Sequence, residues 1–354
     1  MSRKTLGGIV ALVGAILIVA GLVLMLVIVP GMKQFPDDVD TTRTYSGTMP
    51  VLLNPATFEF MTDLDVDLTR HFRTEAVDGD VALVFEEQVL LAAGEPLQRL
   101  VKHYAIDRKS MEVSDAYPEE WASKEGFWPR EGLVLGWPID TEKKDYTGWS
   151  DDYRATVTLA FAGEVKHDRA GITTYYFTAS SPAQPIHPDA VAAMGLPNAL
   201  PKEQFAELIQ GANVSDALKN MIPVLLDQWE EDTIPLQYYY EYEGEYWIEP
   251  ETGVLIDTRK HELRKVGLGE EFLQIAPLLA NMSEEQRAAS RVTVFDLTYQ
   301  ATNESVQDAK KDAEDAANQI ELFGTTIPVV AIIIGALLIV VGGVLVLSKA
   351  PTVE

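Results

Sequence analysis

A run of apolar residues near the N-terminus, Leu6–Val29, constrains this chain more than any other stretch. It reads LGGIVALVGAILIVAGLVLMLVIV and contains no charged or hydrogen-bonding side chain. A helix of this length extends about 36 Å, which is enough to cross the hydrocarbon core of a bilayer with some tilt. A second run of the same kind, Ile327–Leu347, lies near the C-terminus. We therefore predict transmembrane helices at 6–29 and 327–347, on either side of one large domain at 30–302.

The short segments outside the two runs predict the orientation of the chain. Residues 1–5 carry Arg3 and Lys4, and the tail at 348–354 carries Lys349. Because positive residues favour the cytoplasmic side, we expect both termini in the cytoplasm and the large domain outside it. The first run is longer than the core of a cleavable signal peptide and has no small-x-small site before Pro30, so we expect it to remain as an anchor. The expected location is the plasma (inner) membrane of a cell envelope.

Small residues recur on one face of each predicted span. In lipid, such a face lets two helix backbones approach closely. The sequence therefore predicts that the spans pair through these Gly/Ala faces, either with each other or with a partner subunit. The residues concerned are Gly7, Ala11, Gly14 and Gly21 in the first span, and Ala331, Gly335 and Gly342 in the second.

The charge of the chain lies almost entirely between the spans. The termini carry a net charge of +2, so of the formal net charge of −26, −28 falls on residues 30–326. This excludes nucleic acid as a partner and disfavours docking on anionic headgroups, because both need clustered Lys and Arg. The acidity is explained by solubility or by attraction to cations and basic partners, and we favour solubility. Since the chain has no cysteine, the domain relies on its core rather than on disulfides.

Strand and turn patterns between the spans predict an α+β fold: a β-rich antiparallel ectodomain, as a sheet or an irregular barrel, with a helical insertion at 189–231. Two hairpins are expected, one from runs 154–163 and 172–180, the other at 246–257. The proline-rich stretch 181–189 is expected as a linker, and the helix at 215–231 as interrupted by Pro223.

The C-terminal part of the domain is expected to be largely helical. Residues 269–289 predict one helix, before a last strand at 291–300. Residues 303–326 form a juxtamembrane segment whose helix, 303–323, is amphipathic and can be capped by Asn303. A hinge at Gly324 and Pro328 is compatible with the sequence. The apolar stripe of this helix consists of Val306, Ala309, Ala313, Ala316, Ile320 and Phe323.

No catalytic, cofactor-binding or metal-binding residue is identified from the sequence, and no cofactor is expected. The common nucleotide, hydrolase and zinc motifs are missing, and the histidines are scattered without ligand spacing. Asp63, Asp65 and Asp67 could chelate Ca²⁺, but they are better explained as the wet face of a strand. The carboxylate pairs 86–87 and 151–152 should point opposite ways if they lie on strands, which does not suit acid–base chemistry. We therefore expect no enzyme.

Aromatic residues are unusually dense between Trp121 and Trp149. Large rings of this kind serve either as anchors of a core or as the wall of an apolar binding site. We keep both interpretations for this region. The six residues are Trp121, Phe127, Trp128, Trp137, Tyr146 and Trp149.

Three motifs carry a resemblance to a known family: WPIDTEKKDYTGWSDD (137–152), GITTYYFTAS (171–180) and YWIEPETGVLID (246–257). The chain resembles actinobacterial two-pass envelope proteins of unknown function labelled the porin PorA family, over nearly its whole length. The motifs are turns and strand starts, so the resemblance implies no site residue. A membrane barrel needs many strands with lipid-facing apolar alternation, whereas this chain crosses the membrane with helices. The two-span layout also resembles class B scavenger receptors, in topology only.

Two functions follow as hypotheses. The first is non-enzymatic binding or transfer of lipids or other apolar envelope molecules, with membrane lipids and an apolar ligand of the ectodomain as partners. The aromatic region, and the helical insertion acting as a lid, would serve this function. The second is a structural or assembly subunit of a cell-envelope membrane complex.

Overall fold

The computed structural model describes residues 2–54, 57, 59–214, 216–269, 272 and 283–348. The chain forms two compact units, one made of residues 1–35 and 310–354 and the other of residues 36–309. Each unit is treated by itself. Most of the helix predicted at 269–289 and the tail after Ser348 lie outside the described residues.

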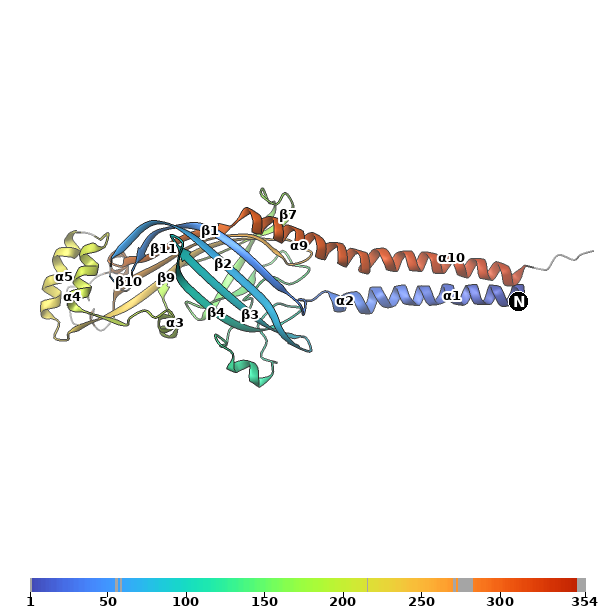
Figure 1. The fold of residues 1–354 in the computed structure, drawn as a ribbon, viewed down its shortest axis with the longest axis horizontal. Helices are drawn as coiled ribbons and strands as arrows, with labels where there is room; N and C mark the ends of the chain where they lie inside the picture. The colour runs from blue at the N-terminus through green and yellow to red at the C-terminus, as the bar shows by residue number, and fades with distance from the viewer. Residues whose placement is uncertain are drawn as a thin grey trace, which may run out of the picture. The chain divides into compact units, whose positions relative to one another are not determined.

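The first unit is a pair of helices long and apolar enough to span a membrane. They lie side by side and antiparallel (Figure 1). The π-helical segment η3 occupies the expected hinge region around Gly324, so the helix is continuous there. The elements are α1 (Arg3–Val23), the π-helical segment η1 (Leu24–Ile28), α2 (Val29–Met32), η3 (Leu322–Thr326) and α10 (Ile327–Leu347).

Glycines spaced by seven residues hold the two helices together. A Cβ atom on Gly14 would lie 2.5 Å from the carbonyl oxygen of Gly335, and one on Gly7 would lie 2.7 Å from that of Gly342. Neither position has room for a side chain, because backbone contacts backbone there. Gly8 and Gly343, one residue further on, would meet nothing within 4 Å. The small-residue faces thus pair the two spans with each other.

The second unit is an antiparallel sheet that curls into a half-barrel (Figure 1). Its strands follow the order β4-β3-β2-β1-β11-β10-β9-β7-β6-β5, and β8 pairs with β9. The predicted hairpins are present as β6–β7 and β9–β10. The strands are β1 (Asp40–Leu53), β2 (Phe60–Asp78), β3 (Val81–Ala92), β4 (Glu95–Asp107), β5 (Tyr146–Ser150), β6 (Ala155–Lys166), β7 (Thr173–Pro185), β8 (Ala199–Pro201), β9 (Thr233–Ile248), β10 (Leu255–Leu268) and β11 (Val292–Ala301). The fold is therefore α+β and β-rich, as predicted.

Helices are inserted between the strands, and the short ones pack at the margins of the sheet. α4 and α5 pack against each other, and α4 also contacts β8 and β9. Their buried side chains include Phe205 and Leu208 of α4. The helices are η2 (Glu119–Ser123, a 3₁₀ helix), α3 (Pro188–Ala193), α4 (Lys202–Gly211), α5 (Asp216–Gln228), α8 (Glu284–Ala289) and α9 (Asn303–Glu321).

Two local predictions about prolines are wrong. The stretch 181–189 is not a linker, because β7 continues to Pro185. Pro182 lies at an irregularity in the pairing with β9, where a missing N–H is tolerated. Helix α5 is not interrupted at Pro223. Proline leaves the carbonyl four residues earlier without its helical donor, and here that carbonyl, of Lys219, accepts from Gln210 Nε2 at 3.4 Å.

The start of α9 is joined to the sheet by hydrogen bonds. Thr302 Oγ1 accepts from the Ser305 backbone N–H at 3.2 Å, and Ser305 Oγ accepts from the Thr44 N–H at 2.7 Å. Thr302 therefore caps the helix, rather than Asn303, whose side chain accepts from Arg169 Nη1 at 3.3 Å. Val306, from the predicted apolar stripe, is fully buried. The first turn of α9 is thus fastened to the half-barrel.

Candidate binding cavity

The curled sheet encloses a cavity of about 260 Å³, and we call the face of the sheet that lines it the inner face. Side chains from β2, β3 and β4 line one side, and side chains from β9, β10 and β11 line another. The cavity is close to the volume of about 300 Å³ at which small-molecule pockets begin. It is the candidate functional site of the part of the chain that the structure describes.

The inner face is made by alternate residues of long strands. On β10 the lining residues are Thr258, Lys260, Glu262 and Arg264, while the residues between them point outward. On β9 they are Tyr240, Tyr242 and Tyr246. Sequence reasoning missed these positions, although a signal was present. Strands with charges or tyrosines at every second position, and polar residues between, do not form an ordinary apolar core.

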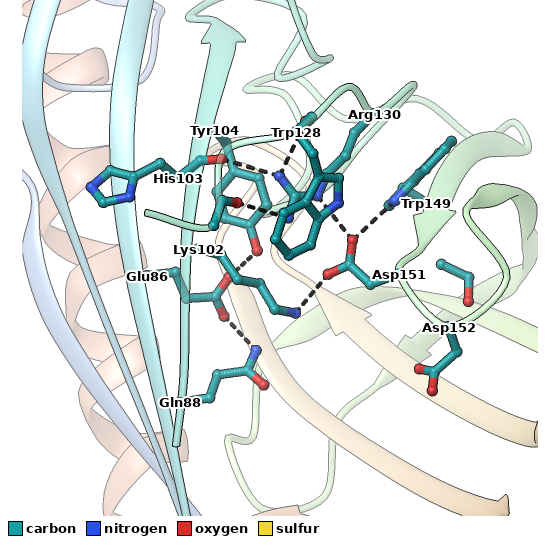
Figure 2. Close-up of polar contacts among 12 residues, drawn as sticks. Glu86, Gln88, Lys102, His103, Tyr104, Trp128, Arg130, Trp149, Asp151 and Asp152 are labelled. Carbon is teal, nitrogen blue, oxygen red and sulfur yellow. Dashed lines mark hydrogen bonds and ion pairs between the residues drawn. The ribbon is translucent and has the colours of Figure 1, made fainter. Parts of the chain in front are cut away.

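A buried ion pair lies between β2 and β3. Glu86 is completely buried and pairs with Arg70. It also accepts from the Tyr104 hydroxyl and from Gln88 Nε2, the latter at 2.6 Å, as Figure 2 shows. Burial by itself would raise the pKa of Glu86, but Arg70 and Lys102 outweigh it and lower the pKa to about 2. Glu86 is therefore a charged and fully hydrogen-bonded member of the wall.

A second cluster joins the two edge strands of the sheet, β4 and β5. Lys102 Nζ of β4 lies 2.8 Å from Asp151 Oδ2, in the turn after β5, and Arg130 Nε lies 2.9 Å from Asp151 Oδ1 (Figure 2). Trp149 Nε1 also donates to Asp151, at 3.0 Å. Although burial opposes it, the two cations hold the pKa of Asp151 well below its usual value.

The segment that carries Arg130 fills the gap between these edges. Its guanidinium donates to the His103 carbonyl of β4 at 3.1 Å and lies over the Trp128 ring, 3.9 Å from the centroid. A few residues on, Leu133 donates to the Thr147 carbonyl of β5 at 2.8 Å. The cavity thus has a polar seam, made by Lys102, Arg130 and Asp151, where the barrel would otherwise stand open.

A third cluster lies on the β10 side of the cavity. Arg264 Nη2 lies 3.1 Å from Asp152 Oδ1 and 3.9 Å from Glu262 Oε2. Burial, joined by the charge of Glu262, raises the pKa of Asp152 despite Arg264. Burial also acts to raise the pKa of Glu262, but Lys260 and Arg264 outweigh it, so that the net shift is downward. Glu262 in addition accepts from the Tyr299 hydroxyl at 3.1 Å.

Aliphatic residues cover much of the remaining wall, so the cavity is amphipathic rather than wholly apolar or wholly charged. They come from the strands on both sides and from the segment before β5. These residues are Leu68, Leu90, Leu100, Leu133, Val134, Leu135, Val157, Leu159, Leu255 and Leu297.

The aromatic-rich region does both things that its sequence allowed. Trp137 and Trp149 line the cavity, and the Trp137 ring packs 5.4 Å from that of Tyr246. Trp121 instead joins a small core with Val81 and Leu83, on residues of β3 that alternate with the cavity-facing ones. The helical insertion contributes no residue to the described lining, so its geometry does not support a lid.

The carboxylates considered from the sequence have clear places. Glu86 lines the cavity and Glu87 points outward to Arg99, as expected for a strand. Asp151 and Asp152, by contrast, lie in a turn and both line the cavity, so the prediction that they diverge is wrong. The three aspartates of β2 considered for Ca²⁺, 63, 65 and 67, are exposed.

Each histidine has a local structural partner. His71, His167 and His261 each lie 2.8–2.9 Å from one aspartate oxygen, those of Asp40, Asp257 and Asp296. His103 lies 3.3 Å from Glu75, and His187 caps α3. The described residues contain no group of three His, Asp or Glu side chains arranged to hold a metal ion. The groups that the described lining offers to a ligand are therefore charged side chains and hydrogen-bond donors and acceptors.

These features define a membrane-anchored protein whose β-rich half-barrel encloses an amphipathic cavity. The chain belongs to the porin PorA family, because the family model described as Porin PorA matches residues 6–344. This match covers the first apolar run, the whole half-barrel and most of the second apolar run, and it confirms the resemblance of the three motifs. No curated protein matches the chain.

Proposed function

We propose that the protein is a non-enzymatic binding or transfer protein for a lipid or another envelope molecule with a large apolar part, held in the half-barrel cavity. The observation that carries the proposal is the wall of the cavity, in which leucines alternate with paired charges. Leucine side chains facing a water-filled space are unfavourable, whereas an apolar chain in that space would bury them.

The polar part of the wall is compatible with such a ligand. Arg70, Lys102, Arg130 and Arg264 each lie in ion-pair contact with a carboxylate of the wall, although Lys102 and Arg130 share one carboxylate. Paired charges and tyrosine rings accept the less polar part of an amphipathic molecule at lower cost than isolated charges do.

The two spans would hold this domain at the membrane. Neither span contains an ionisable residue, as a pathway for ions or polar solutes usually does, so we infer that they are anchors. We further propose that the spans lie in the plasma (inner) membrane of the envelope, and that the half-barrel lies outside the cytoplasm. The chain has no cysteine, so Val224→Cys, at an exposed site of α5, should react with a membrane-impermeant maleimide in intact cells. Ser2→Cys should react only after lysis, and the reverse pattern would reject the orientation.

Retained ligand provides the main test. The full chain, extracted from its native membrane and washed in detergent, should release a consistent set of amphipathic molecules that mass spectrometry can identify. Leu100→Trp places an indole in the cavity and should abolish this retention. Arg99→Trp is the matched control, since Arg99 is the neighbouring, outward-facing residue of β4. Equal retention by both variants, or an empty wild-type protein, would reject the proposal.

The structural or assembly role remains the alternative. The observation that weighs against it is that the small-residue faces of α1 and α10 are occupied by each other, which leaves outward faces of large aliphatic residues. Crosslinking in native membranes separates the two functions. A defined complex recovered equally with wild type and Leu100→Trp would favour assembly.

A further inference from the structure

One charged side chain of the cavity differs from the others in its surroundings. The described lining contains five cations and four carboxylates, although the whole chain has a formal net charge of −26. Four of the cations, named above, lie in ion pairs. The fifth, Lys260, has no carboxylate oxygen of a described residue within ion-pair distance of its Nζ, and it makes no hydrogen bond to these residues.

The strands beside Lys260 place tyrosine side chains around it. In the register of the sheet, Lys260 of β10 lies opposite Gly244 of β9 and Tyr299 of β11. The Tyr246 side chain covers Gly244 so closely that a Cβ atom there would lie 2.7 Å from its hydroxyl oxygen. Lys260 Nζ lies 5.9 Å from the centroid of the Tyr246 ring. An ammonium group and a phenol hydroxyl therefore share one part of the wall.

The nearest acidic group, Glu262, acts on Lys260 electrostatically but forms no ion pair with it. Glu262 is the next inward residue of β10, and it is engaged by the Tyr299 hydroxyl and by Arg264. The phenols of Tyr246 and Tyr299, helped by Glu262, raise the pKa of Lys260 well above its usual value, although burial lowers it. Lys260 is thus a positive charge at neutral pH, in a partly desolvated wall, and no carboxylate of the described residues lies in ion-pair contact with it. Such a charge is costly unless an anion is bound beside it.

We propose that Lys260 binds the anionic headgroup, a carboxylate or a phosphate, of a single-chain amphipathic ligand whose apolar part lies against the leucines of the cavity. The proposal rests on the function proposed above and names its ligand class. A headgroup oxygen would accept charge-assisted hydrogen bonds from the Lys260 ammonium and from the Tyr246 hydroxyl.

Binding of matched probes tests this inference. Full-chain protein in nanodiscs is dialysed against radiolabelled laurate, dodecyl phosphate or dodecanol, and the uptake by empty nanodiscs is subtracted. Wild type should bind both anionic probes more tightly than the alcohol. Lys260→Met should lower the affinity for the two anionic probes at least about tenfold and leave the affinity for dodecanol unchanged. Lys260→Arg should restore most of the anion binding.

Lys265→Met is the control, because Lys265 is an outward residue of the same strand, 2.7 Å from Glu241. It should bind all three probes like wild type. Anion binding unaffected by Lys260→Met, with dodecanol bound, would overturn the assignment of Lys260 and leave the proposed function standing. Failure of wild type to bind any of the three probes would overturn both. If inorganic phosphate competes as strongly as dodecyl phosphate, the site binds a free anion. This result would overturn the proposal that the ligand is amphipathic.

Discussion

The helix pair and the inner face of the half-barrel are stabilised by opposite kinds of contact. In the helix pair, residues 6–29 and 327–347 contain no ionisable side chain, and contact depends on glycines that let backbones touch. In the half-barrel, nine charged side chains line one cavity, and the ion pairs between them join one strand to another. The comparison shows where each region is fragile: the helix pair where a side chain is added to a glycine, and the half-barrel where a counterion is removed.

The largest expected effect is on the buried ion pair. Glu86→Ala should lower the free energy of unfolding by about 3–5 kcal/mol, because it leaves Arg70 buried without its partner. Glu87→Ala, one residue along, breaks only the half-exposed pair with Arg99 and should lower it by less than about 1 kcal/mol. Urea unfolding followed by tryptophan fluorescence measures both. Similar losses in the two variants would show that the inner pairs are no more important than surface pairs.

Acid should weaken the half-barrel for the same reason. The pKa of Glu86 is lowered from 4.5 to about 2 in the folded chain, so its contribution is present above pH 4.5 and is lost as the pH falls through about 2. The loss should be about 3 kcal/mol. Asp151 changes in the same direction. Urea unfolding at a series of pH values between 6 and 2 measures this loss. The free energy of unfolding should fall less steeply with decreasing pH in Glu86→Gln than in wild type. An identical slope in this variant would contradict the assignment to Glu86.

The helix pair should respond to bulk where the half-barrel responds to charge. Gly14→Leu should weaken the pairing by about 1–3 kcal/mol, since a side chain there meets the Gly335 backbone. A disulfide between Gly21→Cys and Ala331→Cys reports the pairing, because a Cβ atom at position 21 would lie 3.5 Å from that of Ala331. The same Cβ atom would lie 2.9 Å from the Pro328 carbonyl oxygen, so both cysteines are present in every protein that is compared. Gly14→Leu should slow its formation, and Gly8→Leu should not. Equal rates would show that the glycine contact does not hold the pair.

The smallest effect is expected at Lys260. In the absence of ligand, Lys260→Met should change the free energy of unfolding by less than about 1 kcal/mol, because no ion pair of the described residues is lost. The same urea measurement applies. A loss as large as that of Glu86→Ala would mean that Lys260 serves the fold rather than a ligand.

Sequence alone determined the features that depend on local pattern. Two uninterrupted apolar runs with glycines every seven residues predict two spans and their close approach, and α10 begins and ends at the predicted residues, Ile327 and Leu347. Alternation predicts the strands and hairpins, and the match to the porin PorA family reaches into the second span. None of these requires knowledge of which distant segments meet.

The cavity required the tertiary structure, because its chemistry comes from pairs that are far apart in the chain. Asp152 and Arg264 meet only because β5 and β10 face each other across the curled sheet, and Asp151 faces the same cavity as Asp152 only because a turn replaces the expected strand. Lys260 shows the same dependence. In the sequence it is one of 28 basic residues of an acidic chain. Curling of the sheet brings it into the cavity, where it is the one lining cation that forms no ion pair with a described carboxylate. Local pattern decides which way a side chain points, while the pairing of distant strands decides what it meets.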